Sequence, residues 1–126
     1  MLSGFLFIMQ QLTDKKLLQE FKDCSLTANQ FTHKVHIHVA YLYLKQWGYK
    51  DGSARFLTHL KQFTKAHGAS TKYNAALSKA ALDIIYERMC ASTHIKPFET
   101  FLETHPDLQT NFKLLVQKRL TQNSNS

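Results

Sequence analysis

The sequence predicts an all-α protein, built as a compact single-domain bundle of five or six helices. The chain has 126 residues and is 44% hydrophobic, which suits one globular domain with a core of its own. Only four glycines and two prolines interrupt it, fewer than a turn-rich β fold requires. No stretch shows the alternation of apolar and polar residues that is typical of a half-buried strand.

The chain begins with an apolar stretch that is followed by the first predicted helix. Residues 1–11 are expected to form an N-terminal arm that docks on the core. Alternatively, Met9 is the true first residue, and the residues before it come from the choice of start codon. This stretch lacks the basic leading region and cleavage site of a secretion signal. Thr13 is a suitable N-cap for a helix that runs to about Asp23. The residues of this helix expected to face inward are Leu17, Leu18 and Phe21.

Capping and breaking residues divide the rest of the domain, predicted over residues 12–120. Thr27 and Gln30 have the spacing of a capping box, and Gly48 is suited to end a helix. The later helices are expected over about residues 32–47, 53–67, 72–90, 97–104 and 107–120. Residues 121–126 are polar and are expected to be a flexible tail.

The helix predicted over about residues 32–47 is expected to be the buried centre of the bundle. On a helical wheel it is apolar around most of its circumference, and His38 belongs to a narrow polar stripe. His33 and His36 fall on the inward side, three residues apart. This histidine pair is the strongest polar feature of the sequence.

The helix predicted over residues 72–90 adds further polar groups that face the pair. Asn74 falls within the apolar arc of this helix, where a buried amide needs hydrogen-bond partners. Tyr73 is its neighbour, and His67 lies at the end of the preceding helix. The sequence therefore predicts a ligand pocket made of His33, His36, Tyr73, Asn74 and His67.

Three interpretations of these residues stay open. In the first, the pocket hydrogen-bonds a small ligand. In the second, His33 and His36 bind a divalent transition metal, because neutral imidazole is a good ligand for such ions; any carboxylate ligand would come from Glu20 or Asp23. In the third, both histidines are core residues whose nitrogens are hydrogen-bonded at the helix start. No nucleophile motif, phosphate loop or carboxylate pair indicates an enzyme, so the sequence leans toward a binding protein.

Two segments carry a resemblance to a known family. They are Phe31-Thr32-His33-Lys34-Val35-His36, leading into Val39-Ala40-Tyr41-Leu42-Tyr43-Leu44, and Lys72-Tyr73-Asn74-Ala75-Ala76-Leu77-Ser78. Over roughly residues 12–115 the chain resembles small, uncharacterised, all-helical bacterial proteins with an aromatic-x-His-x-x-His helix start and a later Lys-Tyr-His-x-Thr-Leu-Thr. The resemblance implies the helical architecture and the position of the polar cluster, and it brings no activity. Asn74 replaces the histidine of that pattern, and Ala76 and Ser78 replace its threonines, so a three-histidine metal site would lack one ligand here.

The charge distribution favours a rival function, that of an interaction module. The chain carries 16 Lys and Arg against 9 Asp and Glu, a net charge of +7. Part of this excess lies on the helix after Gly48, which turns Arg55, Lys61 and Lys65 outward. Such a face is suited to an acidic protein or a nucleic acid. The apolar N-terminal arm would add a surface for a homodimer.

The cysteines and the hydropathy bear on location. Cys24 and Cys90 stand alone, without the spacing of a metal or redox motif, and two such cysteines suit a reducing compartment. No run reaches the roughly 18 consecutive apolar residues of a membrane-spanning helix. The sequence therefore predicts a cytoplasmic protein without a membrane span.

Overall fold

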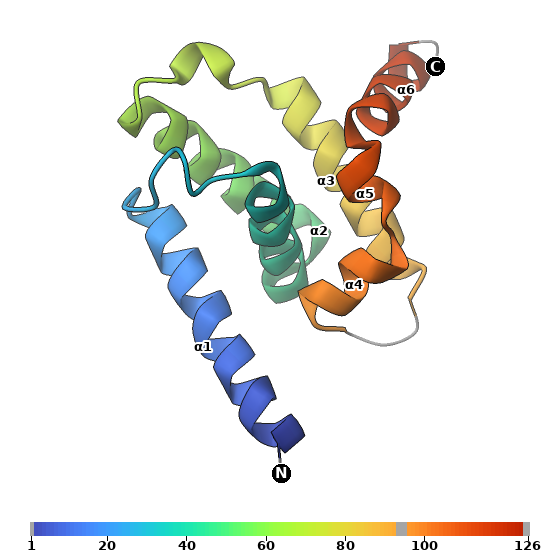
Figure 1. Cartoon of the computed structure of the whole chain (residues 1–126). Helices are drawn as coiled ribbons and strands as arrows, with labels where there is room; N and C mark the ends of the chain where they lie inside the picture. Colours follow the sequence, from blue (N-terminus) through green and yellow to red (C-terminus); the bar gives the residue numbers. More distant parts are fainter. Residues whose placement is uncertain (1, 93–95, 125–126) are drawn as a thin grey trace.

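The computed structural model describes residues 2–92 and 96–124, and the side chains of residues 8–92 and 96–122. Over these ranges it contains six α-helices, one short 3-10 helix and no strand, which confirms the predicted all-α fold (Figure 1). The elements are α1 (Leu2–Lys22), α2 (His33–Ala66), η1 (Ser70–Lys72), α3 (Ala75–Cys90), α4 (Phe98–Thr104), α5 (Asp107–Thr110) and α6 (Phe112–Ser124). None of the helices in the described part of the chain combines the length and apolar character needed to cross a bilayer.

Helix α2 lies at the centre of the arrangement, as the sequence predicted. It packs against α1 on one side and α3 on the other, and α3 in turn packs against α6 (Figure 1). The reason is its composition: from residue 37 to residue 44, all side chains except His38 are buried. A helix that is apolar around most of its circumference loses its contact with water only when neighbours cover several of its faces.

Both ends of the chain differ from expectation. Helix α1 begins at Leu2, so residues 2–11 are helical and continuous with the predicted first helix. Its first turns project beyond the bundle in Figure 1. At the other end α6 runs to Ser124, so residues 121–124 are helical where a flexible tail was expected. The last two residues lie outside the described ranges.

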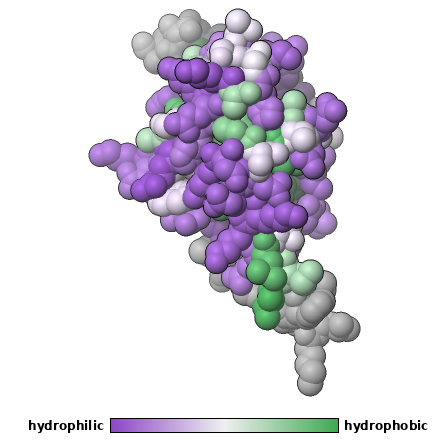
Figure 2. Space-filling model, turned by 90° about the vertical axis from the view of Figure 1, so that its left-hand side faces the viewer, coloured by the Kyte–Doolittle hydropathy of each residue, from purple (hydrophilic) through white to green (hydrophobic). Residues whose placement is uncertain are grey.

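The face of the molecule on the α1 side is mostly hydrophilic, with a small hydrophobic band toward the projecting end of α1 (Figure 2). Among the described side chains of this helix, from residue 8 onward, the exposed large apolar ones are Ile8, Met9 and Leu12. A homodimer through this segment stays a prediction.

A glycine corner divides α2 into two halves, a first half of residues 33–47 and a second half of residues 49–66. Gly48 has φ 78° and ψ −177°, a conformation that essentially only glycine adopts, so the two helices predicted from the sequence meet at this residue. The second half returns close to the first. A Cβ atom at Gly52 would lie 2.6 Å from the carbonyl oxygen of Tyr43, so only a glycine fits there.

Phe21 of α1 anchors the core inside this corner. It is fully buried, and its ring lies 5.4–5.9 Å from the ring centroids of four other aromatic residues. These four are Phe31, Tyr43, Phe56 and Phe63. Aromatic clusters of this kind bury a large apolar area and add favourable ring–ring contacts. The cluster holds α1 against both halves of α2.

Gly52→Ala is expected to destabilise the protein by about 1–3 kcal/mol, because the new methyl group meets backbone atoms that cannot move independently. Urea unfolding measures the effect. The adjacent Ser53→Ala is the control and is expected to cost nothing, since the Ser53 hydroxyl is buried without a hydrogen-bond partner among the described residues. Equal stability of the Gly52→Ala and wild-type proteins would contradict the close contact.

Candidate functional site

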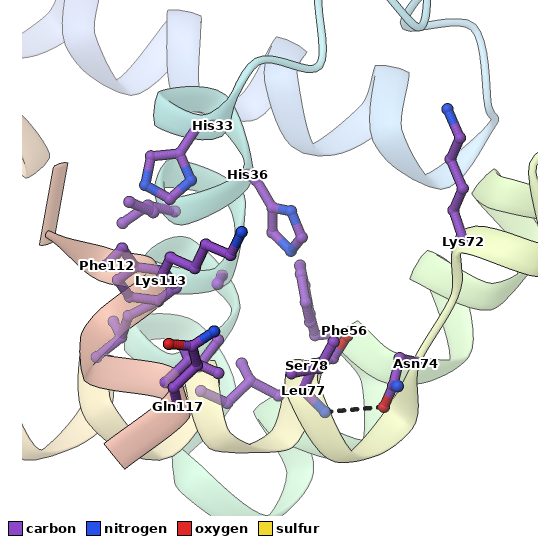
Figure 3. Close-up of a pocket in the computed structure, with 16 residues that line it drawn as sticks. His33, His36, Phe56, Lys72, Asn74, Leu77, Ser78, Phe112, Lys113 and Gln117 are labelled. Atoms are coloured by element: carbon purple, nitrogen blue, oxygen red, sulfur yellow. Dashed lines mark hydrogen bonds between the residues drawn. The ribbon is translucent and has the colours of Figure 1, made fainter. Parts of the chain in front are cut away.

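A cavity of about 440 Å³ lies between α2, α3 and α6 (Figure 3). Its volume falls within the range of roughly 300–1,000 Å³ that is typical of small-molecule sites. Most of its wall is apolar and consists of Ile37, Ala40, Phe56, Leu77, Ala81, Leu82, Ile85, Phe112 and Val116. The remaining lining residues are polar or basic: His33, His36, Lys72, Asn74, Ser78, Lys113 and Gln117. The lining thus combines a hydrophobic interior with basic and amide groups and contains no carboxylate.

His33 lies at the start of α2, at the edge of the cavity. Thr32 caps the helix and accepts a hydrogen bond from the amide of Val35 at 3.3 Å, which fixes the direction in which α2 leaves the loop. His33 Nε2 is 3.1 Å from the carbonyl oxygen of Leu108. A carbonyl only accepts, so His33 Nε2 carries the proton in this hydrogen bond. The side chain is exposed, whereas the sequence placed it on the buried side.

His36 points into the cavity from the next turn of α2 (Figure 3). One face of its ring stacks on Phe31 at 5.0 Å between centroids, and Phe56 packs nearby at 5.6 Å. Burial lowers the pKa of His36 to about 4, with a smaller contribution from His33, so the ring is neutral at pH 7. Within the described part of the chain its nitrogens form no hydrogen bond with the protein. His33 is hydrogen-bonded but exposed, and His36 has no hydrogen bond to any described group, so the interpretation of a hydrogen-bonded core pair fits neither histidine.

Asn74 has a different role from the one that the sequence suggested. The predicted helix over residues 72–90 begins at Ala75, because Ser70–Lys72 form the separate η1 turn and Asn74 is the N-cap. Its Oδ1 accepts a hydrogen bond from the amide of Leu77 at 3.0 Å, drawn as a dashed line in Figure 3. Asn74 is exposed at the rim, so it is not a buried amide in search of partners. Asparagine is a favoured N-cap, which accounts for the shorter helix.

Tyr73 and His67 do not line the cavity, although the sequence grouped them with it. Tyr73 is half-buried in the extended turn before Asn74. His67 packs on Phe63, with 4.4 Å between the ring centroids, at the end of α2. Of the five predicted pocket residues, the structure brings His33, His36 and Asn74 to the cavity and leaves these two outside it.

Helix α6 supplies a wall of the cavity that the sequence did not assign to it. Phe112 and Val116 have the apolar spacing of an inward face, which was the only signal. Lys113 comes directly after Phe112, Gln117 comes directly after Val116, and both also border the cavity. The predicted single helix over residues 107–120 is divided at Asn111, whose φ of −139° is not helical. This break sets where α6 starts.

The metal interpretation requires a third ligand beside the two histidines. Among the described residues, no three His, Cys, Asp or Glu side chains form a group that could hold a metal ion. The two carboxylates considered from the sequence have other partners. Glu20 faces Lys16 at 3.8 Å, and Asp23 accepts a hydrogen bond from the Ser25 amide at 2.9 Å.

The three residues of the predicted basic face lie on the second half of α2, and all are exposed. Arg55 lies over the ring of Trp47 at 4.9 Å, and Lys22 of α1 lies 5.0 Å from the same ring. Lys61 and Lys65 are four residues apart and share one side of the helix. Arg55 therefore has a packing role in addition to its charge.

Comparison of the chain with models of protein families, with curated proteins and with solved structures found no match. The resemblance to helical bacterial proteins stays a prediction. The functional interpretation rests on the geometry and chemistry of the cavity.

The low pKa of His36 predicts a loss of stability in acid. The unfolded chain binds a proton near pH 6.5 and the folded protein only near pH 4, so the free energy of unfolding falls as the pH drops between these values. The expected loss is about 3 kcal/mol. His36→Gln removes the titrating group, and urea unfolding at pH 7 and pH 4 compares it with wild type. A loss of the same size in both proteins would contradict the buried neutral imidazole.

Proposed function

We propose that this protein binds a small, largely apolar ligand in the cavity between α2, α3 and α6. The observation that carries the proposal is the position of His36. Its neutral imidazole points into a mostly apolar cavity and has no hydrogen bond to any described group. Small-molecule sites typically combine apolar walls with a few polar groups that fix the orientation of the ligand.

The energetics favour an occupied cavity. His36 is half-buried and its ring nitrogens stay accessible from the cavity, so a ligand that hydrogen-bonds to them replaces water there at little cost. The apolar wall contributes in addition, at about 25 cal/mol for each Å² of apolar surface removed from water. Leu77, which lines the cavity, is 43% exposed, and a bound ligand would remove part of its apolar surface from water.

A small organic ligand fits these residues better than a metal ion. The imidazoles of His33 and His36 are not arranged as a pair of metal ligands. His33 already donates a hydrogen bond to the Leu108 carbonyl, and its ring lies at the rim of the cavity. The apolar wall has no role in holding a metal, whereas it is the main recognition surface for an organic molecule.

Filling the cavity is expected to abolish binding of an apolar probe. The neutral fluorophore N-phenyl-1-naphthylamine serves as the probe, since its emission rises in apolar surroundings. Ala81→Trp places a large ring where the cavity now is and is expected to weaken probe binding at least tenfold. Ala76→Trp is the matched control, on the same helix but exposed and outside the cavity, and is expected to bind like wild type.

Circular dichroism establishes that both tryptophan variants are folded. Unchanged binding in Ala81→Trp, or no binding to the wild-type protein, would overturn the proposed function.

A further inference from the structure

The chemical class of the ligand, an inference that rests on the proposed function, follows from the charges and the apolar wall of the cavity. We propose that the cavity takes a single-chain amphipathic anion, with its charged head between Lys113 and His36 and its chain against α2 and α3. An alkyl carboxylate is the simplest molecule of this class.

Uncompensated positive charge at the cavity indicates an anion. Lys72 and Lys113 both border it, and no Asp or Glu is among the lining residues. The ion pairs of the described side chains involve other basic residues, such as Lys34 with Glu99 and Arg119 with Glu87. An anion would therefore gain a favourable potential at this place, and a cation would be repelled.

The position of the ligand's charged head follows from the side chains at the rim of the cavity. Figure 3 shows Lys113 extending from α6 toward His36, with Gln117 one turn further along α6. A carboxylate head at this edge would accept hydrogen bonds from the Lys113 ammonium on one side and from the single N–H of the neutral His36 imidazole on the other. Charge-assisted hydrogen bonds of this kind are stronger than neutral ones.

At the rim of the cavity, the charged head of the ligand also stays in contact with water. A separate polar hollow of about 300 Å³ adjoins this rim and shares His33, Phe112 and Lys113 with the cavity. A charged head there keeps part of its hydration, so it avoids the large cost of complete burial.

The body of the ligand follows from the apolar wall. Leu77, Ala81 and Ile85 are four residues apart, so they form one row along α3, about 12 Å from first to last. Ile37 and Ala40 of α2 line the same cavity. A trough of this length suits one alkyl chain of medium length, and the volume of about 440 Å³ leaves little room for a second.

The test compares three probes that share one chain and differ in charge. The probes are decanoate, 1-decanol and decylamine, each used below the concentration at which it forms micelles. The affinity of each is measured by its displacement of N-phenyl-1-naphthylamine from the full-length wild-type protein. Decanoate is expected to bind at least tenfold more tightly than decanol, and decylamine most weakly. Lys113→Glu is expected to remove the preference for decanoate and to leave decanol unchanged. Lys118→Glu makes the same charge change on α6 outside the cavity and is expected to behave like wild type.

The outcomes separate the two proposals. Equal affinity for decanoate and decanol in a wild-type protein that binds the fluorophore would overturn the anion and leave the cavity function standing. Equal losses in Lys113→Glu and Lys118→Glu would overturn the assignment of the head site to Lys113. Failure of the fluorophore itself to bind would overturn the proposed function and the inference with it.

Discussion

Gly52 lies so close to the carbonyl oxygen of Tyr43 that a Cβ atom there would be 2.6 Å from it. This close approach brings the two halves of α2 together in a corner that no side chain at residue 52 would allow. The corner forms the aromatic slot that Phe21 fills from α1. With the first half of α2 held in this way, His36 faces α3 and α6 and reaches the cavity.

Features set by local chemistry could be predicted from the sequence. Thr27 and Gln30 exchange the hydrogen bonds of a capping box, at 2.9 and 3.2 Å, and Gly48 separates two helices because its positive φ suits few other residues. Asn74 shows the limit of such reasoning. Ser70, Thr71 and Asn74 are all capable N-caps, and a helical wheel that starts three residues early assigns Asn74 to the wrong environment.

Features that depend on distant contacts could not be predicted. His38 was placed on a solvent-facing stripe, yet its Nε2 lies 3.0 Å from Asp14 and its ring stacks on Phe98 at 4.2 Å. Nothing in the local sequence links these residues. Lys113 reaches the cavity for a similar reason, because its position depends on the break at Asn111 and on the packing of α6 against α3.

Imidazole ¹⁵N NMR of the protein with and without decanoate shows whether an anion binds beside the neutral imidazole of His36. A neighbouring negative charge favours the protonated ring, so bound decanoate is predicted to raise the pKa of His36 above its free value of about 4. His59, which lies outside the cavity, is predicted to titrate unchanged. An unaltered His36 titration at saturating decanoate would mean that no anion binds beside this ring.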